Sequence, residues 1–242
     1  MDNEQQTRKL VAWIKEKVTA AGCKGMVLGL SGGLDSSVLA ALCKRAFPES
    51  ILGIIMPCHS IDTDKSHAGI VADLFNIPTM EVCLDGAYDA MLQVLPDYQP
   101  DKAIGNLARA NLKARLRMVT LYYIANQLKY LVVGSGNRSE LTVGYFTKYG
   151  DSGVDILPLG KLVKAEVREL ARYLKIPREI IDKPPSAGLW EGQTDETEMG
   201  FSYEALDRYI LTGDAPEELK RKIEAMQASA AHKCATPPVP DF

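Results

Sequence analysis

Short apolar runs alternate with amphipathic stretches along most of this chain. Runs of strand length, buried in character, lie at 26–30, 51–57, 79–84 and 130–135, and 155–159 is a candidate for a short fifth strand. Apolar residues at helical spacing predict an opening helix that ends near Gly22 and further helices at 36–47, 64–75, 102–128 and 164–174. The alternation predicts an α/β protein with a parallel sheet covered by helices on both faces.

Right-handed crossovers would make this sheet doubly wound and Rossmann-like, with its ligand crevice beyond the carboxyl ends of the strands. Three loops that contain turn-forming residues such as Gly, Pro and Ser follow predicted strands at that edge, at 30–35, 57–60 and 134–140. The last part of the chain differs in character. A segment rich in Pro, Gly and acids at 182–200 favours a loop or lid, and helices are expected at 202–211 and 216–231. We expect one domain over 1–242 with a helical C-terminal elaboration.

Composition narrows the class of function. The 242 residues carry a net charge of −3, which gives no reason from the whole chain to expect nucleic-acid binding and leaves open a local basic patch. No stretch reaches the roughly 18 apolar residues of a membrane span, and the polar N-terminus does not resemble a secretory signal. Five scattered cysteines never form C-x-x-C, so reduced thiols in the cytoplasm are expected rather than disulfides or zinc.

The stretch "LGLSGGLDSSV" (28–38) joins the first predicted strand to the following helix. Gly32 and Gly33 lack Cβ atoms, so their amides can approach a phosphate closely. The hydroxyl of Ser31, the serines at 36–37 and the amides at the helix N-terminus face the same place. The spacing is not that of a Walker loop, which needs G-x-x-x-x-G-K-[ST]. The stretch predicts a nucleotide cradle.

Asp35 lies inside this cradle, where its charge would repel a phosphate. A divalent cation between the two would remove that repulsion, so the residue predicts Mg²⁺ on a polyphosphate such as ATP. The alternative is that Asp35 only caps the helix while the glycines make a tight turn.

"SGGLDS" (31–36) resembles the signature of the ATP pyrophosphatase superfamily, whose members cleave ATP between its α and β phosphates. The resemblance implies an adenine nucleotide alpha hydrolase-like fold. In the second half, "GYFTKYGD" (144–151) resembles the G-x-x-T-x-Y-G-D block of the NAD synthetases. "NLKARLRM" (111–118), the segment 183–210 and "HK" (232–233) resemble further motifs of that family, so the likeness covers nearly the whole chain.

This resemblance implies ATP-dependent adenylation of the nicotinate carboxylate of deamido-NAD and displacement of AMP by ammonia. Only about two dozen residues precede the first strand, so we expect ammonia rather than a fused glutaminase domain as the nitrogen source. The family also implies a homodimer with deamido-NAD at the interface. Leu112, Leu116, Val119 and Tyr123 share one helical stripe that could pack there or cover the sheet.

The family motifs carry roles onto matching residues of this chain. Catalytic roles fall on Asp35, Lys164 and Asp155, and Mg²⁺ ligation falls on Asp35 and Glu140. Ser135 and Ser186 stand where many members have threonine, and Cys234 stands where arginine often follows the H-K pair. The implied ATP-binding residues are Gly29, Leu30, Ser31, Gly32, Gly33, Leu34, Asp35, Ser36, Ser135, Lys164 and Ser186, and the implied deamido-NAD-binding residues are Arg115, Lys148, Asp155, His232 and Lys233.

Without the family, these residues have simpler interpretations. Arg115 and Lys164 would each be a solvated surface charge, and Glu140 would form a capping box with Asn137. Rival functions are a sibling such as the ATP-cleaving unit of GMP synthetase, a tRNA-thiolating enzyme and a nucleotide sensor without turnover. The tRNA enzyme usually shows C-x-x-C and a basic surface, and this sequence has neither.

Overall fold

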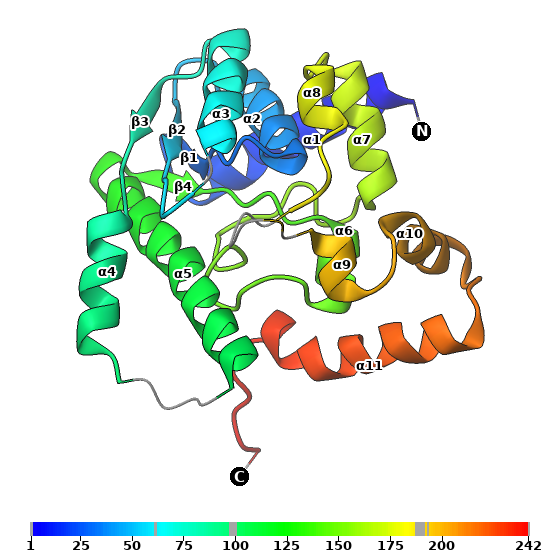
Figure 1. The fold of residues 1–242 in the computed structure, drawn as a ribbon. Helices are drawn as coiled ribbons and strands as arrows, with labels where there is room; N and C mark the ends of the chain where they lie inside the picture. Colours follow the sequence, from blue (N-terminus) through cyan, green and yellow to red (C-terminus); the bar gives the residue numbers. More distant parts are fainter. Residues whose placement is uncertain (1, 61, 97–100, 187–191, 193, 242) are drawn as a thin grey trace.

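A parallel sheet in the order β3-β2-β1-β4 forms the centre of the computed structural model, which describes residues 2–60, 62–96, 101–186, 192 and 194–241 (Figure 1). Met26 of β1 pairs in register with Ile51 of β2 on one side and with Leu131 of β4 on the other. The chain therefore changes direction across the sheet at β1, as a doubly wound fold requires. The strands are β1 (Gly25–Gly29), β2 (Ile51–Ile55), β3 (Thr79–Glu81) and β4 (Tyr130–Val132).

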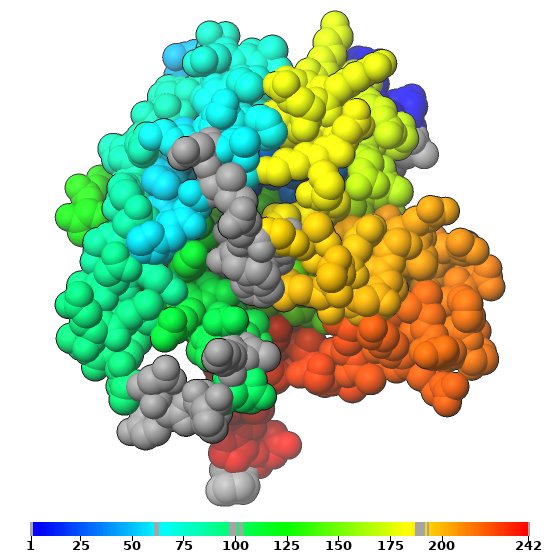
Figure 2. All heavy atoms as spheres, in the orientation of Figure 1, coloured from blue at the N-terminus to red at the C-terminus, as the bar shows by residue number. Residues whose placement is uncertain are grey.

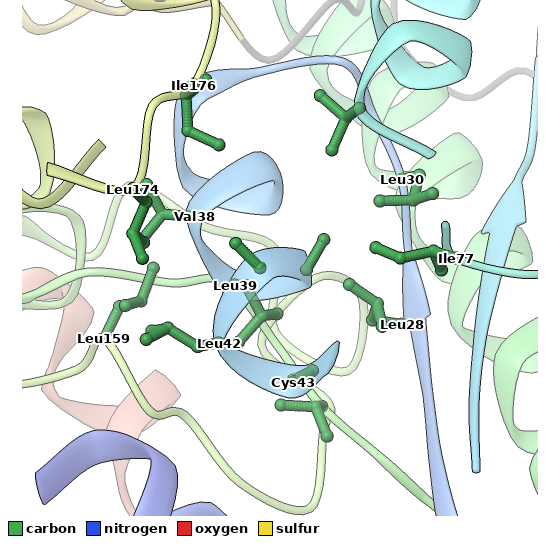
Figure 3. Packing of buried hydrophobic residues seen from close by; sticks show 14 of the residues in the cluster. Leu28, Leu30, Val38, Leu39, Leu42, Cys43, Ile77, Leu159, Leu174 and Ile176 are labelled. Atoms are coloured by element: carbon green, nitrogen blue, oxygen red, sulfur yellow. The ribbon is translucent and has the colours of Figure 1, made fainter. Parts of the chain in front are cut away.

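Helices cover both faces of this sheet, and alternate strand residues point to opposite sides. Met26 and Leu28 pack in the larger core cluster, while Val27 packs in the second cluster with Met118 of α5. Figure 3 shows the larger cluster, where Leu28 and Leu30 meet side chains of α2. The larger cluster draws on α1 (Asn3–Ala20), α2 (Leu34–Ala46), α3 (Asp62–Phe75), α7 (Lys164–Tyr173) and α8 (Arg178–Ile181), and the second draws on α4 (Asp85–Val94) and α5 (Lys102–Leu128).

The C-terminal elaboration has a small core of its own. Met199, Tyr203, Leu206 and Ile223 pack together with Val143, which belongs to α6. In Figure 1, α10 and α11 stand to one side of the sheet, below α7, and Figure 2 shows the same region in orange and red at the lower right. The elaboration joins the sheet domain through α6 (Arg138–Val143) and α7. It consists of α9 (Asp195–Met199), α10 (Tyr203–Thr212) and α11 (Glu217–Cys234).

Most predicted elements are confirmed, with differences of a few residues at their ends. The candidate fifth strand at 155–159 is wrong, because only Ile156 makes an isolated parallel bridge, to Val133. Sequence patterns missed α4, α6, α8 and α9. In the predicted loop at 182–200, residues 187–191 and 193 lie outside the described residues. Within the described ranges, no helix combines the length and apolar character that a membrane crossing needs.

Only part of the α5 stripe covers the sheet. Leu112 and Leu116 pack against the second core cluster and so cover the sheet. Val119 and Tyr123 point outward, with exposed fractions of 66% and 69%. The outer half of the stripe is therefore available to another surface.

Gly32 makes the turn between β1 and α2 possible. Its φ is +73°, and a Cβ at this position would lie 2.2 Å from the backbone oxygen of Asp64 on α3. L-residues rarely adopt this φ, and the contact is with backbone, which cannot turn aside. The requirement for glycine comes from the close approach of α3 as well as from the turn.

We expect Gly32→Ala to lower the free energy of unfolding by at least about 2 kcal/mol, because strain in φ adds to the clash with Asp64. Gly22→Ala is the matched control, since Gly22 has φ +67° and nothing within 4 Å of its added Cβ. Urea unfolding of both variants separates the two effects. Equal decreases in the free energy of unfolding would mean that the clash with α3 contributes nothing to the effect of Gly32→Ala.

Candidate active site

A cavity of about 580 Å³ lies at the carboxyl ends of β1 and β4. It is the place where a doubly wound sheet binds its ligand. The walls come from the turn after β1, the loops after β2 and β4, α5, and the segment that leads to α9. All residues assigned to ATP except Gly32 line it, together with the two assigned to Mg²⁺: Gly29, Leu30, Ser31, Gly33, Leu34, Asp35, Ser36, Ser135, Glu140, Lys164 and Ser186.

The turn after β1 is built as an anion cradle. Gly33 is the N-cap of α2 and offers no side chain, so the first amides of the helix are not capped by its own N-cap residue. Ser31 and Ser36 hydroxyls lie 2.9 Å apart, and the Ser36 hydroxyl donates to the Gly33 carbonyl at 3.0 Å. The cradle therefore presents amides and hydroxyls in one small volume, which suits a phosphate group.

Asp35 does not cap α2. Its Oδ2 accepts a hydrogen bond from Lys164 Nζ at 2.5 Å, and its Oδ1 accepts one from Asn137 Nδ2 at 3.0 Å. The carboxylate thus points across the cavity toward α6 and α7. The helix-cap interpretation of Asp35 is wrong for this structure.

Lys164 is buried, so the surface interpretation is also wrong. Its side chain is 4% exposed, and its Nζ lies 3.2 Å from Glu140 Oε1 as well as 2.5 Å from Asp35 Oδ2. The same Nζ lies 4.8 Å from the centre of the Tyr203 ring, within the range of a cation–π contact. One ammonium therefore holds two carboxylates from distant parts of the chain.

Glu140 forms the capping box that its spacing from Asn137 suggested, and it also contacts Lys164. Asn137 and Glu140 form a capping box at the start of α6: the Glu140 amide donates to Asn137 Oδ1 at 3.0 Å, and the Asn137 amide donates to Glu140 Oε2 at 3.1 Å. Glu140 Oε1 remains for Lys164. The cap fixes the carboxylate in the orientation that the cluster needs.

The electrostatics of this cluster follow from burial and from pairing. Burial raises the pKa of Glu140 to about 7, although the Lys164 charge acts in the opposite direction. Burial alone would lower the pKa of Lys164, but the Asp35 and Glu140 carboxylates outweigh it and the net shift is upward. Lys164 therefore stays charged at neutral pH, while Glu140 titrates near it.

Asp195 brings a third carboxylate close to this ammonium. Burial raises its pKa, and Lys164 opposes that shift. Its Oδ2 accepts from the Tyr203 hydroxyl at 2.9 Å, whereas Oδ1 is buried without a hydrogen-bond partner among the described residues. This buried oxygen is an acceptor that a cation or a donor of a bound ligand would satisfy.

The donor set fits Mg²⁺ on a polyphosphate. Asp35 and Glu140 share one ammonium, and Mg²⁺ usually takes one or two carboxylates, phosphate oxygens and waters rather than an all-protein cage. In keeping with this, the described part of the chain holds no group of three His, Cys, Asp or Glu arranged as a metal cage.

The residues assigned to deamido-NAD mostly lie outside the cavity wall. Arg115 Nε donates to the Lys148 carbonyl at 3.3 Å, and Lys148 Nζ donates to the His232 carbonyl at 2.6 Å. Lys233, which does line the cavity, donates to the carbonyls of Gly144 and Phe146 at 2.8 and 3.1 Å. These four residues tie the loop after α6 to α5 and α11.

Asp155 stands apart from both groups. Its Oδ1 accepts from the Tyr122 hydroxyl at 2.9 Å and its Oδ2 accepts from the Val132 amide at 2.8 Å. The structure therefore places it at the end of β4, not beside Asp35 and Lys164. Its assigned catalytic role remains a prediction.

Several charged groups of the cavity were not singled out from the sequence, among them Arg117, Lys183 and Asp64. Arg117 Nε donates to the Met56 carbonyl at 3.2 Å, and burial lowers its pKa. Lys183 forms an ion pair with Asp64 across the cavity mouth. Arg117 belongs to the motif "NLKARLRM" (111–118), as does Arg115. The motif therefore pointed to an arginine at this place, but helical spacing alone did not show which of the two faces the cavity.

Glu140→Gln is expected to flatten the pH dependence of stability in the metal-free protein. A carboxyl whose pKa rises from 4.5 to about 7 on folding stabilises the folded state below about pH 4.5, and this contribution is lost as pH rises through about 7. Relative to wild type, the variant should therefore gain about 1–3 kcal/mol between about pH 5 and pH 8. Urea unfolding in a chelator measures the difference, and a pH-independent difference would contradict the raised pKa.

Comparisons with known proteins agree with this geometry. The family model described as NAD synthase matches residues 6–237. An NH(3)-dependent NAD(+) synthetase from Carboxydothermus hydrogenoformans is 52% identical over 240 residues, which cover 98% of this chain and 97% of the relative.

Solved structures give the same result. An NMN synthetase from Francisella tularensis superposes with a TM-score of 0.93 at 34% identity, with 100% of each chain covered. An NH3-dependent NAD synthetase from Campylobacter jejuni superposes with a TM-score of 0.82 at 30% identity, again with 100% of each chain covered. The match of the family model and relatives above 30% identity over nearly the whole length show that this chain belongs to the NAD synthase family.

Proposed function

We propose that this chain amidates the nicotinate carboxylate of deamido-NAD with ammonia, at the expense of ATP, to give NAD, AMP and pyrophosphate. The Asp35–Lys164–Glu140 cluster beside the glycine cradle carries the proposal, because it suits a metal-bound triphosphate better than a simple anion. The names of the relatives support the acceptor. We place the reaction in the cytoplasm, in keeping with five thiols that are free in the structure.

The reaction needs two steps because a carboxylate is a poor acyl donor. In the first, a carboxylate oxygen bonds to the α-phosphorus of ATP, the bond from that phosphorus to the bridging oxygen of the β-phosphate breaks, and pyrophosphate leaves. In the second, the nitrogen of ammonia bonds to the acyl carbon, AMP leaves with its oxygen, and the nitrogen loses a proton. Most of the catalysis is positioning and charge neutralisation.

Different residues of the cavity would position the phosphates, hold the metal and neutralise charge. The amides and hydroxyls of Ser31, Gly33 and Ser36 would hold phosphate oxygens, and Ser135 and Ser186 line the same cavity. Asp35 and Glu140 would hold Mg²⁺, which would neutralise charge on the phosphates. Lys164 supplies a fixed positive charge next to both carboxylates and a donor for phosphate oxygens.

We propose a homodimer in which a second copy completes the acceptor site. Arg115, Lys148 and His232 lie on the surface beside α5, outside the ATP cavity. Val119 and Tyr123 of the same helix are largely exposed apolar side chains, and a second copy of this surface would cover them. Deamido-NAD would then extend from the cavity toward the partner.

Nicotinate mononucleotide is the second candidate acceptor. The Francisella relative is an NMN synthetase, and its TM-score of 0.93 exceeds the 0.82 of the Campylobacter NAD synthetase. Both acceptors present the same carboxylate, so the cluster at Lys164 serves either. The difference lies in whether the surface beside Arg115 binds an adenylyl group.

The direct test is pyrophosphate release from ATP, Mg²⁺ and ammonium with each acceptor in turn. We expect release to depend on deamido-NAD, with a kcat/KM at least about tenfold above that for nicotinate mononucleotide, equivalent to about 1.4 kcal/mol. A reversed ratio would assign the mononucleotide reaction. Release only with xanthosine monophosphate would indicate a GMP synthetase-like sibling, and no release with any acceptor would favour a nucleotide sensor.

Asp35→Asn should lower the turnover number by about a hundredfold or more, because loss of the carboxylate charge loosens Mg²⁺ and unbalances Lys164. Asp73→Asn on the exposed side of α3 is the control for the same chemical change. Steady-state pyrophosphate assays at saturating ATP and several Mg²⁺ concentrations measure the effect. Turnover equal to wild type in both variants would remove Asp35 from the site.

A further inference from the structure

The N-terminus of α7, where Lys164 is the first residue, is capped from two other helices. Its own N-cap residue is Val163, whose side chain cannot accept a hydrogen bond. The Lys164 amide instead donates to the Ser139 hydroxyl at 3.0 Å, and the Ala165 amide donates to Asp207 Oδ2 at 2.8 Å. The Ser139 hydroxyl in turn donates to Asp207 Oδ1 at 2.5 Å.

This node is fully enclosed and joins three helices. Ser139 is 0% exposed and Asp207 is 4% exposed, so water does not replace these bonds. Ser139 precedes Glu140 on α6, Lys164 begins α7, and Asp207 lies on α10. One buried carboxylate therefore fixes the backbones that carry two members of the catalytic cluster.

The same face of α10 also contacts the far end of the Lys164 side chain. Tyr203 lies four residues before Asp207, so the two side chains are neighbours on the helix surface. The Tyr203 ring lies under Lys164 Nζ, and the Tyr203 hydroxyl donates to Asp195. Helix α10 thus contacts Lys164 at its backbone through Asp207 and at its ammonium through Tyr203.

The charge of Asp207 has a second effect. A cation at the first position of a helix faces the positive end of the helix dipole, which is unfavourable. Lys164 occupies that position in a buried site. The carboxylate of Asp207 accepts from the Ala165 amide at this helix terminus, so its negative charge offsets the positive potential there.

We propose that Asp207 is a positioning residue that holds Lys164 in register with Asp35 and Glu140. It acts through the Ala165 amide and Ser139 and does not touch the reacting atoms. The inference rests on the proposed function for its kinetic consequence, but the geometry it explains is independent of the acceptor.

The kinetic test compares Asp207→Asn with wild type. A displaced Lys164 stabilises the charge of the transition state less well, so kcat should fall by about tenfold to a hundredfold while KM for ATP changes by less than about threefold. Ser202→Ala is the matched control. Ser202 is the N-cap of α10 itself, accepting from the Ala205 amide at 3.2 Å, and its loss should weaken α10 but leave kcat within about twofold.

Two further variants distinguish a displaced Lys164 from a general loss of folding. Asp207→Glu keeps the charge and should recover part of the lost kcat, and Ser139→Ala removes one bond of the node and should lower kcat less than Asp207→Asn. If Asp207→Asn does not fold, Ser139→Ala decides the question. A kcat equal to that of Ser202→Ala in the folded variants would overturn the proposal.

A double-mutant cycle tests the node without any assay of activity. Asp207→Asn and Lys164→Met should be non-additive in urea unfolding, whereas Ser202→Ala and Lys164→Met should be additive. Additivity of the first pair would overturn the positioning role. An inactive wild type with a non-additive first pair would instead reject the proposed function and keep the node.

Discussion

The site depends on the ion pairs that the buried ammonium of Lys164 forms. The ammonium lies between Asp35 on the nucleotide loop and Glu140 on α6, and it balances two charges that would otherwise be unstable away from water. The Asp35 carboxylate can therefore lie beside the phosphate-binding turn. The capping box at Asn137 orients Glu140, and the bonds that the first amides of α7 donate to Ser139 and Asp207 hold Lys164 beside it.

Much of the fold follows from the sequence because its patterns are local. Strands β1 and β2, with five residues each, and long helices such as α5 are predicted from the spacing of apolar residues, and the glycine turn is marked by residue type. Short helices such as α6 are harder to predict from sequence, because six residues show little periodicity. The fifth strand was overpredicted because an apolar run cannot reveal that only Ile156 meets a neighbour.

The site was predictable to the extent that motifs carry chemistry in their residue types. Asp35, Glu140 and Lys164 came from such motifs, and the structure brings them together. Asp207 was not predictable from spacing, since an acid in an amphipathic helix reads as a solvated charge. Its importance depends on which helix terminus it meets, and that is a property of tertiary structure.

The ion pair between Lys164 and Asp35 joins residues 129 positions apart in the chain. During synthesis the glycine loop leaves the ribosome long before its counter-charge exists, and α10 follows later still. Contacts of such long range form late and slowly, since a large loop must close first. The growing chain therefore carries an unfinished nucleotide site through most of its translation, and the site is completed only when the C-terminal helices dock.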